Sequence, residues 1–404
     1  MKKILISALF AALFGSAYAQ SNVTIYGQLD VSVQGQNING GSHPNSPNGS
    51  LTKIASNSSW LGFRGTEDLG NGSSALFQVE TQVNMNGTGT GNMAYGGAQG
   101  FTVLRDTYVG LNNQSAGLVK LGYLSTPYKN TLDQIDVFDG RGDAQIATIF
   151  GRTVAGAGST ATAVSQYAMN QTAYGRSTSV MYVTPELAGF TGSLLYSGNG
   201  SNNNTTDQIN TAAVTGAVAP NSVTSGNLKW SGSGVNVIGS VQHARYTNAA
   251  GINVSSLASS NNYVIGAYYV GIPGLKVGAA YGRNQENLNA IPSSGATTAN
   301  SNSTWVGASY RFGNNEPRIS YVNTSNTSGS GNNYTFGSQN GASQWNLGWG
   351  YYLSKRTQVY AIASQIKNNA NGVYNFASYT GGTTNNLTGG ETLTTYGVGM
   401  KTAF

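Results

Sequence analysis

The sequence predicts an all-β protein, a 16-stranded antiparallel transmembrane β-barrel. Three observations carry this prediction. Apolar residues alternate with small or polar residues along many short segments, the N-terminus resembles a secretion signal, and charged residues make up only 8% of the chain, against about 25% in ordinary globular domains. A barrel in lipid requires such alternation, because lipid-facing and lumen-facing side chains follow one another along each strand.

The first 19 residues read as a secretory signal peptide that is removed. Lys2 and Lys3 form its basic end, Ile4–Phe14 its apolar stretch, and Ala17–Ala19 its cleavage site. The apolar stretch is too short to cross a bilayer as a helix, and no later segment approaches the roughly 20 apolar residues that a spanning helix needs. Residues 20–404 are therefore expected to form a single barrel domain.

The absence of cysteine removes disulfides, thiolate metal sites and cysteine nucleophiles from consideration. Stability must then come from a sheet in which each backbone N–H and C=O group finds a neighbour. Closure into a barrel is the non-helical solution that lipid permits.

The predicted strands share one pattern, with an apolar face opposite a small or polar face. Representative segments are Val23–Gln34, Ala75–Val83, Leu275–Gly282, Val306–Phe312, Gln344–Tyr351 and Thr394–Phe404. By this alternation the ionisable residues of these and neighbouring segments point inward, namely Asp30, Glu80, Lys276, Arg311 and Arg318. A wet lumen is expected around them, because an Arg or Lys facing lipid would cost about 2–4 kcal/mol.

Connections between the predicted strands alternate between short and long. Short ones use Gly, Pro and Asn, as tight turns require. The long ones are Gly35–Ile54, Met85–Gly100, Leu124–Gln166, Asn199–Val223, Asn248–Ser260, Glu286–Asn302, Ser325–Ala342 and Asn368–Gly390. Eight long loops imply sixteen strands, with short periplasmic turns and long external loops. A barrel of that size encloses an aqueous channel.

Several motifs resemble the general porins of β-proteobacteria, the trimeric 16-stranded barrels of the Neisseria, Bordetella and Burkholderia type. The matching pieces are Ser21–Gly27 with Asp30, Leu61–Gly72, Ala75–Glu80, Arg105–Leu111, Ser179–Pro185 and the terminal Phe404. The resemblance implies an outer-membrane channel of a Gram-negative bacterium that passes ions and small hydrophilic solutes by diffusion. It also implies a homotrimer surrounded by outer-membrane lipid and lipopolysaccharide. The barrel-assembly machinery would recognise the terminal Phe404.

The resemblance further implies that the third long loop folds into the lumen and narrows it. That loop carries acidic and basic residues, Lys129, Asp133, Asp136, Asp139, Arg141, Asp143 and Arg152. Strand phase and resemblance together place a basic wall opposite them, made of Arg64, Arg105 and Lys120. Opposed charges of this kind set a transverse field and an ionic preference. The alternative for the loop carboxylates is that they cap loop turns by accepting backbone hydrogen bonds.

Two departures from the family pattern bear on selectivity. Trp60 stands where relatives carry a basic residue that faces the lumen, and Leu121–Leu124 stands where they read L-G-R-Q. Both departures remove positive charge from the wall of the lumen. The anion preference that the resemblance implies is therefore expected to be mild. The main alternative is a substrate-selective channel in which Trp60 and Tyr123 stack on a sugar or a small organic acid.

Other functional classes find little support in the sequence. An enzymatic barrel would need a His near a Ser or a carboxylate, but the two histidines, His43 and His243, are far apart and neither has an acidic neighbour. The Arg141–Asp143 tripeptide resembles an adhesion motif but falls in the loop expected inside the lumen. We expect no enzymatic activity, cofactor, metal or nucleic-acid partner.

Overall fold

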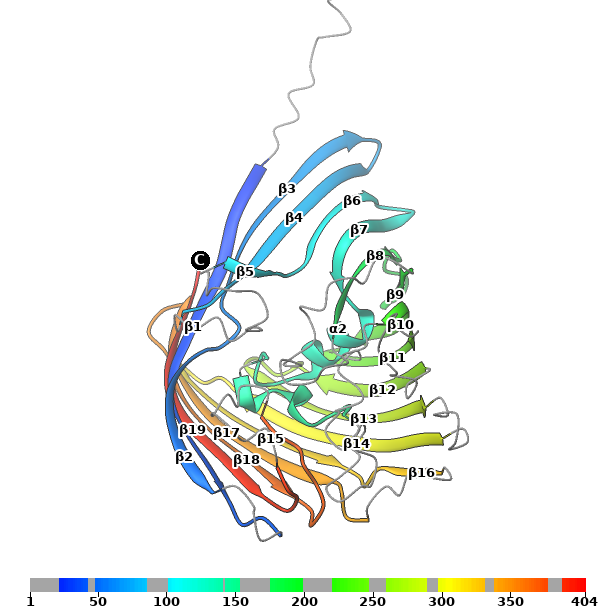
Figure 1. Ribbon diagram of the computed structural model, residues 1–404. Helices are drawn as coiled ribbons and strands as arrows, with labels where there is room; N and C mark the ends of the chain where they lie inside the picture. The colour runs from blue at the N-terminus through cyan, green and yellow to red at the C-terminus, as the bar shows by residue number, and fades with distance from the viewer. Residues whose placement is uncertain are drawn as a thin grey trace, which may run out of the picture.

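The structure is a computed structural model that describes residues 22–42, 48–85, 101–140, 142–152, 175–198, 220–246, 259–288, 297–330, 338–376 and 387–404. These residues form a curved antiparallel sheet that closes around a central space, with one α-helix inside it (Figure 1). The model belongs to the all-β class that the sequence predicts.

The strands follow one another around the wall in chain order. They are β1 (Asn22–Asn39), β2 (Gly49–Ser56), β3 (Trp60–Gly70), β4 (Ser73–Val83), β5 (Phe101–Leu104), β6 (Thr107–Asn113), β7 (Gly117–Ser125), β8 (Arg176–Val183), β9 (Phe190–Ser197), β10 (Pro220–Gly232), β11 (Val235–Tyr246), β12 (Ser259–Tyr269), β13 (Leu275–Leu288), β14 (Thr297–Tyr310), β15 (Asn315–Thr324), β16 (Ser328–Ser330), β17 (Ala342–Tyr352), β18 (Thr357–Asn368) and β19 (Thr392–Ala403).

Three of the barrel's strands are interrupted and therefore appear as the pairs β2/β3, β5/β6 and β15/β16. In each pair both parts bond to the same neighbouring strand: β1, β4 and β14 respectively. Counting each pair once gives the predicted 16 strands.

The barrel closes between its first and last strands. β1 pairs antiparallel with β19 from Gln28↔Ala403 to Asn39↔Thr392. The Gly27 N–H donates to the Phe404 carbonyl at 3.2 Å, and the Phe404 N–H donates to the Gly27 carbonyl at 3.1 Å. The seam thus satisfies backbone groups to the last residue, which a sheet in lipid requires.

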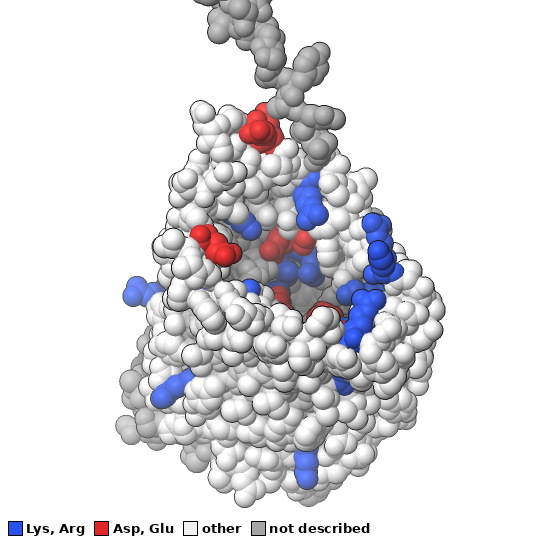
Figure 2. Space-filling view, turned by 180° about the vertical axis from the view of Figure 1, so that it is seen from behind, with Lys and Arg blue, Asp and Glu red and all other residues white. Residues whose placement is uncertain are grey.

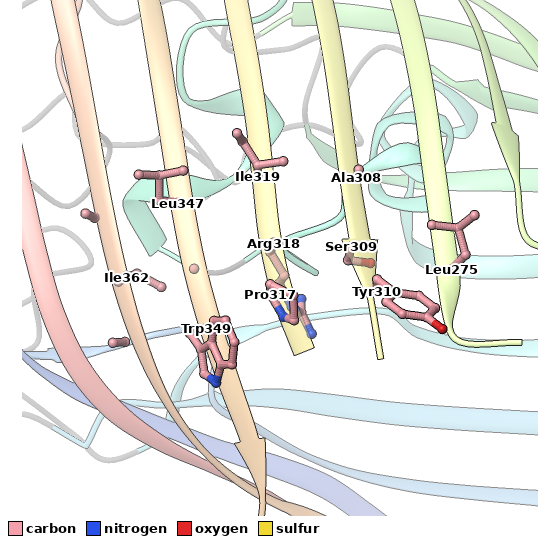
Figure 3. Close-up of a pocket in the computed structure, with 13 residues that line it drawn as sticks. Leu275, Ala308, Ser309, Tyr310, Pro317, Arg318, Ile319, Leu347, Trp349 and Ile362 are labelled. Carbon is pink, nitrogen blue, oxygen red and sulfur yellow. The ribbon is translucent and has the colours of Figure 1, made fainter. Parts of the chain in front are cut away.

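The outer face is apolar and the inner face is polar, as the alternation predicts. On β17, Trp345 and Leu347 are about half exposed, whereas Asn346 between them is 0% exposed. Figure 3 shows the outward side chains of β13–β18 lining a shallow apolar groove of about 660 Å³, with Tyr310, Pro317, Ile319 and Trp349 among them.

The strands extend further than the sequence predicts at several loops. β1 runs to Asn39 and β2 starts at Gly49, so the first long connection is shorter than Gly35–Ile54. After the third connection, β8 is described from Arg176 onward. Strand ends outside the lipid need no apolar face, so polar sequence there does not mark a loop.

The third long connection, called loop 3 here, lies inside the barrel. It contains α2 (Pro127–Ile135) and two 3₁₀ turns, Gly142–Ala144 and Ile146–Thr148. Its apolar side chains, Tyr128, Leu132, Ile135, Phe138, Ile146, Ile149 and Phe150, belong to one buried cluster with wall residues such as Ile238, Val264, Trp305 and Ile362. No helix in the described ranges is long and apolar enough to cross a membrane.

Glycines in the wall make room for these loop 3 side chains. A Cβ on Gly348 would lie 2.8 Å from the Phe138 ring, and one on Gly282 would lie 2.8 Å from Phe150. A Cβ on Gly266 would lie 2.4 Å from the Ile135 Cδ1 atom. These close approaches require glycine and hold loop 3 against the β10–β19 side of the wall.

Candidate functional site: the constriction of the lumen

Loop 3 begins with α2, which packs against the β9–β13 side of the wall. Thr126 caps the helix, because its Oγ1 accepts the Lys129 backbone N–H at 3.2 Å, and Pro127 occupies the first turn. Such a start fixes where the helix begins. Since α2 contacts β9–β13, the passage lies between loop 3 and the opposite wall. Figure 2 shows an opening into the molecule with basic and acidic residues at its depth.

Two adjacent aromatic rings on the inner face of β1 and β3 are flanked by two cations, one at each end of the row. The Arg64 Cζ atom lies 4.6 Å from the centre of the Tyr26 ring. Tyr26 meets Trp60 edge to face, with ring centres 5.2 Å apart. The Arg105 Cζ atom lies 5.8 Å from the Trp60 ring. These distances suit cation–π contacts, which favour a guanidinium over the face of a ring.

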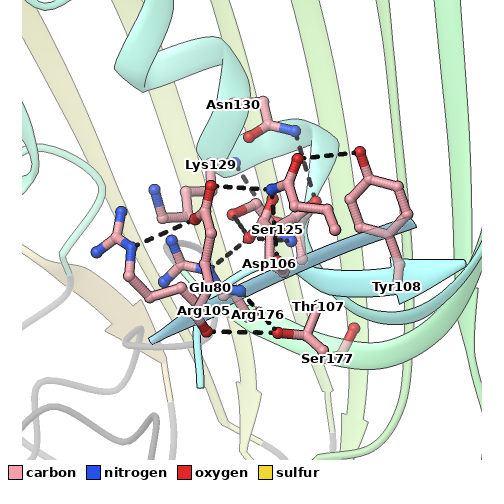
Figure 4. A network of polar contacts seen from close by, with 12 residues as sticks. Glu80, Arg105, Asp106, Thr107, Tyr108, Ser125, Lys129, Asn130, Arg176 and Ser177 are labelled. Atoms are coloured by element: carbon pink, nitrogen blue, oxygen red, sulfur yellow. Dashed lines mark hydrogen bonds and ion pairs between the residues drawn. The ribbon is translucent and has the colours of Figure 1, made fainter. Parts of the chain in front are cut away.

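Glu80 on β4 connects this row to the next strands (Figure 4). Its carboxylate accepts the Tyr26 hydroxyl at 2.9 Å and the Gln78 amide at 2.9 Å. The Arg105 Nε atom lies 3.6 Å from the same carboxylate. Glu80 is therefore neutralised by a cation within the wall rather than standing as a free negative charge.

A second ion pair lies beside the first, where the strand breaks between β5 and β6. The Asp106 carboxylate accepts the Arg176 Nε–H at 2.6 Å and the Ser125 hydroxyl at 2.7 Å. Strict alternation would place Arg105 and Asp106 on opposite faces. The break lets both side chains join one inward network (Figure 4).

Two loop 3 carboxylates face water in the lumen. The Asp133 side chain is 37% exposed and pairs with Lys129 one helical turn earlier. The Asp139 side chain is 50% exposed and lies 2.8 Å from the Arg318 Nη1 atom. The charge of Asp133 also acts on Arg105 across the passage. Loop 3 and the opposite wall therefore face each other with charged groups.

Two other loop 3 carboxylates do not fit the predicted lining. Asp136 and Asp143 are both 0% exposed. Asp136 accepts backbone N–H groups from Phe138 at 3.0 Å, Gly140 at 3.1 Å and Ile146 at 3.4 Å, which is the turn-capping role that the sequence left open. Asp143 accepts the Gln36 side-chain amide at 2.7 Å. Both hold the loop rather than line the passage.

Two of the inward cations bind the backbone of loop 3. The Lys276 ammonium donates to the Asp136 carbonyl at 2.6 Å. Arg318 donates to the Val137 carbonyl at 2.6 Å and to the Glu316 carboxylate at 2.7 Å. Lys276 and Arg318 thus attach loop 3 to β13 and β15.

The remaining predicted residues are spread along the lumen. The Lys120 ammonium lies 4.5 Å from the centre of the Tyr108 ring, and buried Asp30 accepts the Tyr360 hydroxyl. Arg311 is exposed at the turn after β14 and stacks on Tyr352 at 3.7 Å.

Arg152 lies at the end of the described part of loop 3. Its backbone carbonyl accepts the Tyr374 hydroxyl at 3.2 Å, and burial lowers the pKa of the Arg152 guanidinium to about 10. Arg141 lies outside the described residues.

The sequence analysis did not single out several members of the network: Tyr26, Tyr108, Asp106 and Arg176. Tyr26 shares strand phase with Asp30, and Tyr108 lies on the face of β6 opposite exposed Val109 and Leu111, so alternation could have found both. Arg176 could not be found this way, because nothing in the sequence marks where β8 begins. Tyr123 pairs with Thr178 and is buried, at 8% exposed, next to Gly122 with its φ of +151°.

Comparison with known proteins agrees with this geometry. The profile of the Gram-negative porin family matches residues 7–372. An outer membrane porin protein of Bordetella pertussis is 29% identical over 393 residues, covering 91% of this chain and 94% of the relative. The major outer membrane protein P.IB of Neisseria meningitidis serogroup B is 27% identical over 417 residues, covering 95% and 98%.

Solved structures agree on the fold. An anion-selective porin from Comamonas acidovorans matches with a TM-score of 0.68 at 21% identity, covering 95% of this chain and all of that chain. A Salmonella typhi OmpF structure matches with a TM-score of 0.58 at 14% identity, covering 95% and 97%. The fold and family are those of a channel in the bacterial outer membrane. This chain belongs to the Gram-negative porin family.

Proposed function

We propose that this porin is a water-filled channel for passive diffusion of small hydrophilic solutes and ions, with a mild preference for anions. One observation carries the preference. The carboxylates at the constriction are paired with cations, Glu80 with Arg105, Asp106 with Arg176, Asp133 with Lys129 and Asp139 with Arg318. Arg64 and Lys120 instead rest on aromatic rings and form no ion pair with a described residue.

The unpaired charge at this constriction is therefore positive. A fixed charge next to a narrow aqueous passage concentrates counter-ions there and favours their passage. Aromatic rings hold the two side chains in place without neutralising their charge. The name of the Comamonas acidovorans neighbour, an anion-selective porin, is consistent with the same preference.

Reversal potentials in planar bilayers test this proposal. Under a KCl gradient, Arg64→Ala and Lys120→Ala should each lower the chloride-to-potassium permeability ratio by roughly twofold, because each removes an unpaired lumenal charge. Arg105→Ala should also shift the ratio toward cations, since it leaves Glu80 unpaired. Lys367→Ala is the matched control, because Lys367 is an exposed cation on the outward face of β18. Unchanged ratios in the three lumenal variants would contradict the proposal.

A second candidate function rests on the row of Arg64, Tyr26, Trp60 and Arg105. Aromatic faces flanked by guanidiniums fit a small carboxylate that carries an apolar or aromatic part. If the channel is substrate-selective, such acids should block its conductance, and Trp60→Ala should abolish that block. Block by no solute class favours the general channel. Tyr123 does not support this alternative, because its side chain is buried rather than open to a solute.

We further propose that the mature chain begins at Gln20 and assembles as a homotrimer through its first and last strands. The support is the resemblance to trimeric porins and the apolar outward residues of these strands, including Val23, Ile25, Val398 and Met400. The second long loop, Met85–Gly100, is proposed to contact a neighbouring subunit, but it lies almost wholly outside the described residues. Cross-linking of the protein in its native membrane tests the trimer.

A further inference from the structure

The last long connection of the barrel packs against loop 3. Its described first part, residues 368–376, is called the mouth segment here. Tyr374 and Phe376 of this segment are 1% and 3% exposed, and they belong to the same buried cluster as Ile149 and Phe150 of loop 3. External loops carry most of their side chains at the surface. Burial of two aromatic side chains therefore shows that the mouth segment turns inward onto loop 3.

Asn368, the last residue of β18, holds the backbone of Tyr374. Its side-chain amide donates from Nδ2 to the Tyr374 carbonyl at 2.9 Å, and its Oδ1 atom accepts the Tyr374 N–H at 2.8 Å. The same Nδ2 atom donates to the Glu391 carbonyl at 3.1 Å, directly before β19. One buried amide thus satisfies both backbone groups of Tyr374 and ties them to the two last strands.

The mouth segment is also attached to the preceding long connection. The Asn369 N–H donates to the Gly341 carbonyl at 2.9 Å, and the Asn371 N–H donates to the Gln339 carbonyl at 2.9 Å. A Cβ on Gly372 would lie 2.6 Å from the Gly341 carbonyl oxygen, so this approach requires glycine. The mouth segment therefore follows a defined path, although its sequence is rich in Asn.

The described end of loop 3 lies between the mouth segment and the wall. From the mouth segment, the Tyr374 hydroxyl donates to the Arg152 carbonyl at 3.2 Å. From β14, the Ser301 hydroxyl donates to the same carbonyl at 3.3 Å. The Ser303 hydroxyl, also on β14, accepts the Gly151 N–H at 3.1 Å. This end of loop 3 is thus held on two sides, by a wall strand and by an external connection.

The earlier part of loop 3 is held by the wall alone among the contacts described above. There α2 packs on β9–β13, and Lys276 and Arg318 donate to backbone carbonyls of the loop. Tyr374 differs because it comes from a connection between strands, and connections move more readily than the strands that they join. The end of loop 3 is therefore the place where an external loop can act on the passage.

We propose that Tyr374 is a positioning residue for the constriction. Its ring and hydroxyl hold the end of loop 3 against β14, so that the mouth segment and loop 3 move as one unit and together keep the passage at a constant width. Displacement of the mouth segment releases that end of loop 3 and lets the width of the passage fluctuate. The role depends on the position of loop 3 in the lumen and is independent of the proposed anion preference.

Thiol accessibility tests this role, because the chain has no cysteine of its own. Ile149→Cys places a reporter near the end of loop 3, and Ile135→Cys places one in α2; both isoleucines are 0% exposed. The rate of reaction with a small water-soluble methanethiosulfonate is measured on the folded protein in detergent. Added Tyr374→Ala should raise the rate at Ile149→Cys roughly tenfold and leave the rate at Ile135→Cys unchanged, because only one end of loop 3 is released.

Two further variants separate positioning from general stability. Tyr374→Phe keeps the ring in the buried cluster and removes only the hydroxyl bond to Arg152, so it should raise the rate at Ile149→Cys by roughly threefold. Tyr351→Ala is the matched control, because it removes an exposed outward tyrosine of β17 and should change neither rate. Heat-dependent mobility on gels verifies that each variant is folded.

Single-channel recording provides the functional measurement. Open-channel noise should rise in Tyr374→Ala and stay at the wild-type level in Tyr351→Ala. The reversal potential of Tyr374→Ala should not change, because no lumenal charge is removed, and this separates the role of Tyr374 from the charge-based preference. An unchanged rate at Ile149→Cys, unchanged noise, or an equal rise at Ile149→Cys and Ile135→Cys would overturn the proposal, since the last result indicates general loosening inside the barrel.

Discussion

Asp136 illustrates how a charged residue can be assigned to the right loop and the wrong role. Its position in the third long connection suggested a place on the passage. Instead, the Asp136 carboxylate is buried within loop 3 and accepts hydrogen bonds from three backbone N–H groups. Sequence spacing cannot distinguish these cases, because both uses require an acidic residue in an irregular segment.

Burial also changes the titration of Asp136, which gives a residue-scale prediction. Burial disfavours the charged carboxylate and raises its pKa to about 6, although the backbone donors oppose the shift. The unfolded value is about 3.9, so the folded state binds the proton more tightly. The stability that Asp136 contributes is full below about pH 4 and is lost as the pH rises through about 6.

Infrared spectroscopy checks this titration. The protonated C=O band of wild type should contain a component that disappears with a midpoint near pH 6, and Asp136→Asn should lack that component. Asp133→Asn should retain it, because Asp133 lies on the same loop but is partly exposed. If Asp133→Asn lacks the component and Asp136→Asn retains it, the band does not belong to Asp136 and the prediction is wrong.

At the scale of elements, strand phase was informative wherever a strand is continuous. It placed Asp30, Glu80, Lys276 and Arg318 on the inner face, because the period of two leaves no other choice in a closed sheet. It could not place Arg105 and Asp106 together, since the β5/β6 break is a local feature of the backbone. The folding of loop 3 into the lumen came from the resemblance, and the glycine-lined contacts of Phe138 and Phe150 were not visible in the sequence.

Arg318 provides a prediction about how loop 3 is held. Arg318→Ala removes the bonds to Val137 and Asp139 and leaves Glu316 without this cation. Breaking such a buried pair should cost about 3 kcal/mol of stability and let loop 3 fluctuate. Single-channel recordings should show more open-channel noise, and the urea midpoint should fall. Arg311→Ala is the control, because Arg311 stacks on Tyr352 without touching described residues of loop 3; equal noise in both variants would contradict the tethering role.

At the scale of the whole molecule, the sequence predicts the outer and inner faces of the barrel better than it predicts the constriction of the lumen. The apolar exterior and polar interior follow from one repeated pattern, so their prediction needs no knowledge of tertiary contacts. The passage depends on which cations are already paired, and pairing is a tertiary property. Trp60 shows the difference, since its departure from the family pattern was visible but its packing between Tyr26 and Arg105 was not.

The closing seam gives a prediction about the complete barrel. The Phe404 backbone makes two hydrogen bonds to Gly27, whereas its ring is exposed on the outer face. Phe404→Ala keeps both backbone bonds, and deletion of Phe404 removes them at a cost of about 2 kcal/mol. If the ring is a recognition signal for assembly, Phe404→Ala should lower the amount of folded barrel in cells at least tenfold and leave refolding in detergent unchanged.

Deletion of Phe404 should impair both processes, because it removes the signal and opens the end of the seam. Met400→Ala is the matched control, since Met400 is also an exposed apolar residue on the outer face of β19. Heat-dependent mobility on gels, which separates folded from unfolded barrels, measures all variants in cells and in detergent. A loss for Phe404→Ala that is equal in both settings would mean that the ring stabilises the closed barrel, and recognition would then require a different signal on the last strand.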